Sequence, residues 1–128
     1  MSVARGLSGV AAALLLASCG MDAGRQSARD AAALTGGDSD VGEERIRQYG
    51  CDACHSIPGV VGADRRVAPP LSGIAGRMYI AGVLTNTPEN LVKWITDPTS
   101  VNPLTAMPDV GVSHDDARHI AAYLYTLE

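Results

Sequence analysis

The chain has 128 residues, of which 46% are hydrophobic and 4% aromatic, and its formal net charge is −4. This length accommodates one small domain and excludes two. The net negative charge argues against a nucleic-acid partner, and no apolar run reaches the roughly 18 residues that a permanent membrane-spanning helix needs.

Residues 1–18 have the features of an export signal. A short positive segment containing Arg5 precedes an apolar run over Leu7–Ala17, which has about the length of a signal-peptide core. The run leads into Leu-Ala-Ser-Cys at residues 16–19, which resembles the lipobox of bacterial lipoproteins. That resemblance implies cleavage after residue 18 and a lipid on the thiol of Cys19, which would anchor the chain to a membrane. The alternative is an ordinary cleaved signal followed by an incidental cysteine.

The next segment is predicted to be a flexible tether. Residues 20–40 are small or polar, with almost no large apolar side chain, so they cannot bury enough surface to offset the entropy of ordering. Only a weak helix is expected within the tether, over Ser27–Leu34. The predicted organisation is therefore a lipoprotein signal peptide at 1–18, a lipidated cysteine and tether at 19–40, and a folded domain at 41–128.

The folded domain is expected to begin with a short helix, with Asp40 as its N-cap and Glu43 completing a capping box. Directly after it, Cys51, Cys54 and His55 follow in the spacing C-x-x-C-H, which is typical of haem attachment. Two thiols at this spacing can bond the two vinyl groups of one haem, and the adjacent histidine can then ligate the iron. The cofactor predicted from this motif is one covalent haem c with its iron.

Three other interpretations of the two cysteines remain open but are weaker. A thioredoxin-like pair expects a βαβ setting, which the surrounding sequence does not indicate. A zinc site needs four ligands, and the two remaining histidines lie too far round a helix to complete one. A plain disulfide leaves the adjacent histidine unexplained. The absence of phenylalanine from the chain fits a core that a haem helps to fill.

Two further segments follow in chain order. Residues 68–77 read APPLSGIAGR, and their two prolines predict a stiff loop. A helix is expected over Pro88–Thr96, capped by Thr87, with proline at its first position and Trp94 on its apolar face.

The last two segments complete the pattern. Residues 102–108 read NPLTAMP and place Met107 in a proline-containing loop. The chain then closes with a helix over about residues 114–127, which Ser113 caps. An apolar stripe along this helix indicates that it packs on the core.

The C-x-x-C-H motif and these segments, in this order, resemble the class I monohaem cytochrome c family. The resemblance covers nearly all of residues 41–128, which would then be a cytochrome c domain. It implies an all-α fold, in which three to four helices wrap around the one covalent haem and the N- and C-terminal helices cross.

The same resemblance implies roles for individual residues. Met107 would be the second axial ligand of the iron, opposite His55, although a methionine can also be a core filler. The carbonyl of Pro69 would accept a hydrogen bond from that histidine and so orient it. Arg77 would meet a haem propionate, where a solvated loop arginine is the alternative. Trp94 would pack against the haem or donate its indole hydrogen bond to a propionate.

An iron held by both an imidazole and a thioether has no open position for a substrate, and methionine ligation raises its reduction potential. The expected function is that of an electron carrier and not an enzyme, tethered to a membrane between respiratory complexes. The alternatives are a fixed haem c subunit of an oxidase or dehydrogenase complex, and a weak peroxidase-like haem protein.

The expected location is the periplasmic side of a bacterial membrane, with the inner membrane favoured over the outer. The expected state is a monomer held by its N-terminal lipid. Redox partners would be proteins such as a terminal oxidase or a cytochrome bc complex. Because Lys93 is the only lysine, long-range charge steering should be weak. A membrane tether could instead raise the effective concentration of the partner.

Overall fold

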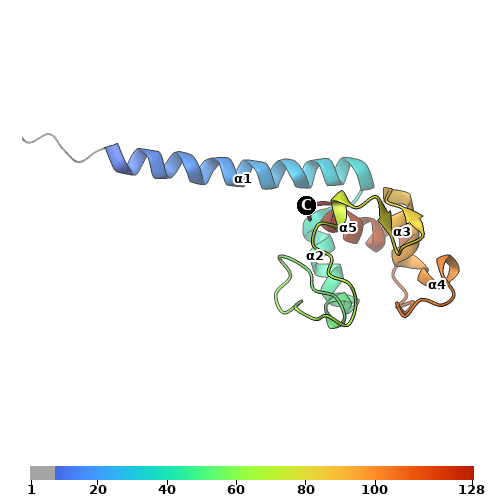
Figure 1. Cartoon of the computed structure of the whole chain (residues 1–128). Helices are drawn as coiled ribbons and strands as arrows, with labels where there is room; N and C mark the ends of the chain where they lie inside the picture. Colours follow the sequence, from blue (N-terminus) through green and yellow to red (C-terminus); the bar gives the residue numbers. More distant parts are fainter. Residues whose placement is uncertain (1–7) are drawn as a thin grey trace, which may run out of the picture.

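The computed structural model describes the backbone of residues 8–128 and the side chains of residues 22–128. Figure 1 shows a long first helix that leads into a group of shorter helices and loops. The helices of this part of the chain are α1 (Ser8–Thr35), α2 (Ser39–Gln48), α3 (Pro88–Thr96), α4 (Pro98–Val101) and α5 (His114–Tyr125). Two 3-10 turns, η1 (Cys51–Ala53) and η2 (Ile74–Gly76), and two strands, β1 (Tyr79–Ile80) and β2 (Leu84–Thr85), complete it.

The predicted all-α fold, with three to four helices wrapped around one covalent haem, is wrong. Over residues 8–128 the structure has five α-helices and a two-stranded antiparallel sheet formed by β1 and β2. The sequence does not indicate the hairpin because each strand has two residues, which is too short for an alternating pattern to appear. The fold is therefore mixed, although most of its regular structure is helical.

The sequence predicts a helix that ends at Thr96 and no further helix directly after it, so α4 is an addition. Asp97 does end α3, and its side chain then accepts a hydrogen bond from the backbone N–H of Ser100 at 2.9 Å. Pro98 occupies the first position of α4, where its missing N–H costs nothing. One Asp-Pro pair thus ends one helix and begins another.

The helix α2 begins earlier than the sequence predicts. Its N-cap is Asp38, whose side chain accepts a hydrogen bond from the backbone N–H of Asp40 at 2.8 Å. The backbone N–H of Asp38 itself donates to Nδ1 of His119 on α5, at 2.9 Å. The predicted capping box is not formed, since Glu43 pairs instead with Arg47. Two aspartates compete for the cap, and a contact with a distant helix selects the first.

A very close approach of two backbones joins α2 to α5. A Cβ atom on Gly42 would lie only 2.0 Å from the carbonyl oxygen of His119, so the two backbones touch at this point. One turn further along α2, Ile46 is buried in the same core as Ile120 and Leu124 of α5. The helix α3 contributes further buried side chains to this core. This packing fixes the end of α2, from which the cysteine motif emerges.

The two helices predicted from capping signals are confirmed at their starting points. The hydroxyl of Thr87 accepts a hydrogen bond from the backbone N–H of Asn90, at the start of α3. The hydroxyl of Ser113 accepts one from the backbone N–H of Asp116, at the start of α5. Both bonds span three residues, which is why the local sequence was sufficient to predict them.

The helix α1 runs through residues that the sequence analysis assigns to the signal peptide and the tether. Residues 20–35 are therefore helical, where a flexible segment with only a weak helix over Ser27–Leu34 was expected. Near its C-terminal end, Ala31 and Thr35 are buried where α1 packs against α5. None of the helices in the described part of the chain is long and apolar enough to cross a membrane. The side chain of Cys19 lies outside the described side chains, so its lipidation and the three-part division of the chain stay predictions.

Candidate functional site

The cysteine motif forms a tight turn at the end of α2. Gly50 adopts a left-handed backbone conformation, with φ of 72°, and turns the chain out of α2 into η1. The backbone N–H groups of Cys54 and His55 then both donate to the carbonyl of Cys51, at 3.2 and 3.0 Å. Cys51 and Cys54 are half-buried free thiols. The sequence spacing thus places two thiols and an imidazole on one short, hydrogen-bonded turn.

The imidazole of His55 has a fixed orientation. Its Nδ1 lies 2.7 Å from the carbonyl oxygen of Pro69. Because a carbonyl can only accept a hydrogen bond, Nδ1 is the donor in this pair, and in the neutral imidazole Nε2 then keeps its lone pair. This is the arrangement found for metal-ligating histidines, in which the second nitrogen is held by a carbonyl or a carboxylate.

The loop that carries Pro69 lies alongside the cysteine turn. The backbone N–H groups of Val67 and Ala68 both donate to the carbonyl of Cys54, at 3.1 and 3.0 Å. The backbone N–H of Leu71 donates to the carbonyl of Ser56, at 2.9 Å. An open hollow of about 630 Å³ lies beside this loop, lined by Ser56, Arg66, Val67, Ala68, Pro69, Pro70 and Ser72.

The surroundings of the Cys51 thiol do not favour thiol–disulfide exchange. Burial raises the pKa of this thiol above its ordinary value, although a backbone hydrogen bond acts in the opposite direction. A protonated, half-buried thiol is a poor nucleophile. The environment of Cys51 therefore argues against a thioredoxin-like redox pair.

The other predicted site residues take different positions. Arg77 turns back to its own loop, where Nη2 donates to the carbonyls of Pro70 at 2.6 Å and Ser72 at 2.9 Å. Trp94 is partly buried and packs against the core from α3. Met107 is half-buried, and its backbone N–H donates to the hydroxyl of Thr105 at 3.1 Å.

The structure does not bring all these residues together. Within residues 22–128, no hydrogen bond links the side chains of Trp94 or Met107 to the turn that holds the cysteines. In Figure 1, residues 102–112 and residues 51–72 extend beyond the same side of the helices α2, α3 and α5, but they stand apart. Among the described side chains, no three from His, Cys, Asp and Glu gather into a group that could hold a metal ion.

One residue near this loop has no sequence signal. The side chain of Asn86 donates hydrogen bonds to the carbonyls of Ile74 and Arg77, and it accepts one from Tyr125. These partners lie between 9 and 39 residues away along the chain. No local motif could have identified them, because only the folded chain brings them together.

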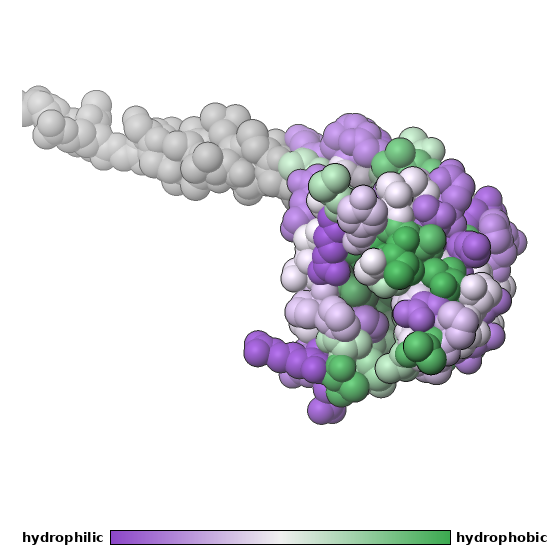
Figure 2. Space-filling model, turned by 45° about the vertical axis from the view of Figure 1, so that its right-hand side comes forward, coloured by the Kyte–Doolittle hydropathy of each residue, from purple (hydrophilic) through white to green (hydrophobic). Residues whose placement is uncertain are grey.

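The loops around the turn expose large apolar side chains. Val61 and Val67 are 84% and 79% exposed, and Leu104 in the later loop is 94% exposed. Figure 2 shows several apolar patches separated by polar surface on the face that it presents. Exposed apolar surface of this kind is typical of sites that contact other proteins.

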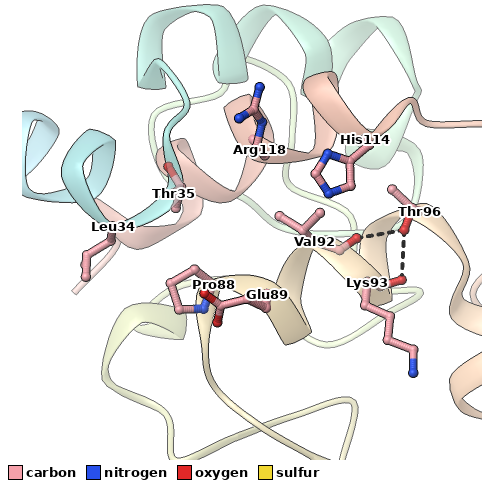
Figure 3. A pocket seen from close by; sticks show the side chains of 9 residues that line it. All are labelled: Leu34, Thr35, Pro88, Glu89, Val92, Lys93, Thr96, His114 and Arg118. Carbon is pink, nitrogen blue, oxygen red and sulfur yellow. Dashed lines mark hydrogen bonds between the residues drawn. The ribbon is translucent and has the colours of Figure 1, made fainter.

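A second hollow, of about 420 Å³, lies away from the cysteine turn, between the C-terminal end of α1 and the helices α3 and α5 (Figure 3). It contains none of the predicted site residues, so the motifs and this hollow define separate places on the molecule. Its lining residues are Leu34, Thr35, Pro88, Glu89, Val92, Lys93, Thr96, His114 and Arg118.

Comparison with known proteins relates the chain to subunits of a respiratory oxidase. It is 34% identical, over 90 residues, to the cytochrome c oxidase subunit 2 of Alkalihalophilus pseudofirmus, a match that covers 68% of this chain and 25% of that protein. Proteins of the same name from Bacillus sp. strain PS3 and Bacillus subtilis are 42% and 33% identical, over 47% and 66% of this chain. The chain spans a quarter or less of the length of these curated relatives. No protein-family model and no solved structure matches it.

These comparisons correct two predictions. The prediction of a carrier that is not an enzyme is wrong, because the relatives are named as subunits of an oxidase, which is an enzyme. The prediction of a covalent haem c with its iron is contradicted as well. The relatives are named for an oxidase subunit and not for a haem c protein, and the described side chains contain no metal-binding group of the kind stated above.

Proposed function

We propose that the chain is an electron-transfer component of a respiratory terminal oxidase at a membrane. Relatives named cytochrome c oxidase subunit 2 support the setting. The single observation that carries the chemistry is the hydrogen bond from Nδ1 of His55 to the carbonyl of Pro69, since it leaves Nε2 free to ligate a redox-active metal. The similarity to oxidase subunits favours a fixed component over a mobile shuttle.

In this proposal the cysteine turn holds the redox centre. Cys51, Cys54 and His55 are the residues of this turn that would bind the centre, and the imidazole of His55 would ligate its metal. Met107 stays a predicted further ligand, which its loop would have to bring to the cysteine turn; its thioether would suit soft or borderline metals and raise the reduction potential. When bound, the centre accepts and releases single electrons. Arg77 and Trp94 stay predicted binding residues.

The task of the protein's own groups is to hold this site still. The carbonyl of Pro69 fixes the imidazole ring and makes it a better donor to a metal. The backbone bonds from Val67 and Ala68 to Cys54 keep the loop in contact with the turn. A site that changes little between its oxidised and reduced forms transfers electrons with a small structural cost.

Two further parts of the proposal concern the cellular location of the protein and the family to which its domain is related. We propose that residues 1–18 are a cleaved signal peptide, that Cys19 carries a lipid, and that residues 19–40 connect it to the domain at 41–128. The terminal oxidase is the proposed partner, and the periplasmic side of the membrane is the proposed location. The cysteine motif and the ordered segments after it support a relationship of the domain to class I cytochromes c. The experiment below identifies the redox centre.

The test uses the full chain, expressed in a bacterial host with a complete respiratory chain and purified from its membranes in mild detergent. The wild type is expected to change its absorption spectrum between oxidised and reduced forms, to contain a stoichiometric metal and to co-elute with an oxidase. Metal analysis and intact mass then identify the centre, including a covalent one. His55→Ala should lose the redox signal, whereas His114→Ala, at the exposed start of α5, should keep it. A wild-type protein without a redox signal would refute the proposal.

A second variant tests the anchor. Cys19→Ala is expected to release the protein from the membrane and to slow its reduction or oxidation by the oxidase at matched cellular abundance. A matched change at an exposed residue of the same segment, Gln26→Ala, should have neither effect. If the Cys19→Ala protein exchanges electrons with the oxidase as fast as the wild type, the tether contributes nothing to docking.

A further inference from the structure

The side chain of Asn86 joins three separate parts of the fold. It lies between β2 and α3, and its Nδ2 donates to the carbonyls of Ile74 at 2.8 Å and Arg77 at 2.9 Å. Its Oδ1 accepts a hydrogen bond from the hydroxyl of Tyr125, at 2.8 Å. Burial raises the pKa of Tyr125, so this hydroxyl keeps its proton well above neutral pH. One amide side chain thus connects the end of α5 to both ends of η2.

From η2 the connection continues to the loop beside the cysteine turn. The guanidinium of Arg77 donates two hydrogen bonds through Nη2, to Pro70 at 2.6 Å and to Ser72 at 2.9 Å. Bonds from a charged donor are stronger than neutral ones, and the planar guanidinium fixes their direction. Because Asn86 holds the backbone carbonyl of Arg77, it also positions the base of the Arg77 side chain. The loop is therefore tied to α5 through two side chains.

The last step leads to the imidazole. The carbonyl of Pro69 accepts the hydrogen bond from His55, and the next residue is Pro70, whose own carbonyl Arg77 holds. The two proline rings restrict the backbone φ angles, so little movement is absorbed between them. We expect a displacement of the Pro70 carbonyl to be passed on in part to the Pro69 carbonyl, because only the ψ angles stay free between them.

We propose that Tyr125, Asn86 and Arg77 form a brace that positions His55 through the carbonyl of Pro69. Tyr125 and Asn86 are positioning residues, and Arg77, which is also a predicted binding residue, contributes here through its bonds to the loop. The consequence for electron transfer rests on the proposed function, but the orientation of the imidazole does not. Loss of the brace should loosen the Nδ1 hydrogen bond and weaken the basicity of Nε2. Outer hydrogen-bond partners of metal ligands typically change metal affinity or activity by about 10-fold to 100-fold.

A purely structural role predicts a different result. The loop is also held by backbone bonds from Val67, Ala68 and Leu71, so it would stay in place if the brace only stabilised η2. Variants of Asn86 or Tyr125 would then lower the stability of the protein and leave the environment of His55 unchanged. The two roles are therefore separated by measuring His55 directly.

The measurement is the ¹⁵N spectrum of the full-length, histidine-labelled protein as purified from membranes, with the redox potential of any bound centre as a second readout. Asn86→Ala and the milder Tyr125→Phe should each shift the Nδ1 signal of His55. In metal-free protein they should also reduce the population of its Nδ1–H tautomer. Two matched controls are used. Asn90→Ala removes the hydrogen bond of 2.9 Å from the Asn90 side-chain amide to the carbonyl of Thr85. Tyr123→Phe, on α5 like Tyr125, removes the hydrogen bond of 2.7 Å from the Tyr123 hydroxyl to the carbonyl of Pro58.

The controls should destabilise the protein to a similar extent without changing the tautomer of His55. If Tyr125→Phe folds and moves the His55 signal no further than Tyr123→Phe does, the brace is overturned, even where Asn86→Ala fails to fold. The position of the Nδ1 signal can be measured whether or not a metal is bound to Nε2. A protein without a redox centre would therefore refute the proposed function and leave this test valid.

Discussion

The contact between α2 and α5 can be tested with a single added methyl group, in Gly42→Ala. The new Cβ would lie 2.0 Å from the carbonyl oxygen of His119 and 3.0 Å from Cβ of Tyr123. Ordinary contacts begin near 3.4 Å, so the helices must separate by about 1.4 Å, the difference between 3.4 and 2.0 Å. The nearest obstacle is backbone, which cannot turn aside as a side chain can.

The expected cost follows from two opposing effects. Overpacking in a well-packed core costs about 1–3 kcal/mol, and a backbone obstacle places this case at the upper end. Against this, alanine stabilises the helix by about 1 kcal/mol relative to glycine, because it is the better helix former. The net loss is about 2 kcal/mol, which lowers the melting temperature of a domain of this size by roughly 10 °C.

Thermal unfolding followed by far-ultraviolet circular dichroism provides the assay. Gly24→Ala is the matched control, since Gly24 lies in α1 with no atom near its added methyl group, and the helix propensity gain is the same. The control should not lower the melting temperature. If Gly42→Ala melts at or above the temperature of the wild type, the backbones of α2 and α5 do not meet at this point.

Three further predictions concern stability, pH and reactivity. The hydrogen bond from Tyr49, together with Arg45, holds the pKa of Asp116 below its usual value. The stability that the ionised Asp116 carboxylate contributes is therefore complete above the ordinary pKa of an aspartate, and it is lost as the pH falls through the lowered pKa. Asp116→Asn should therefore make the urea midpoint depend less on pH on the acid side. An unchanged slope would contradict this. Ser113→Ala should lower the free energy of unfolding by about 1 kcal/mol, while Ser113→Asp should retain most of it; equal urea midpoints for all three proteins would show that the cap is not formed. Free Cys51, with its raised pKa, should react with iodoacetamide much more slowly in the folded chain than in urea, which peptide mass spectrometry can measure, and equal rates would show that the thiol is not buried.

Helix starts could be predicted where the chemistry is local. The caps at Thr87 and Ser113 bond to groups three residues ahead, and both appear in the structure. The start of α2 could not be predicted in the same way. Asp38 and Asp40 are equally good caps by type, and the choice depends on a bond from Asp38 to His119, 81 residues away.

The candidate site also has parts that follow from local sequence and parts that do not. The spacing of Cys51, Cys54 and His55 is a covalent property of the chain, and the turn they form needs only bonds within the motif. The contact of His55 with Pro69 was expected from a family resemblance and not from the residues alone. The cofactor and the class of protein were predicted on the same basis, and there the comparisons with oxidase subunits required correction.

The amino-acid sequence by itself determined which reactive groups stand next to one another, because residues a few positions apart cannot separate. Tertiary structure alone decided how the His55 ring is held, how α2 meets α5 at Gly42, and how Asn86 connects Tyr125 to the loop. Each of these depends on segments that are far apart in the chain and meet only when the helices pack. Packing is a collective result of the whole core, so no short stretch of sequence contains it.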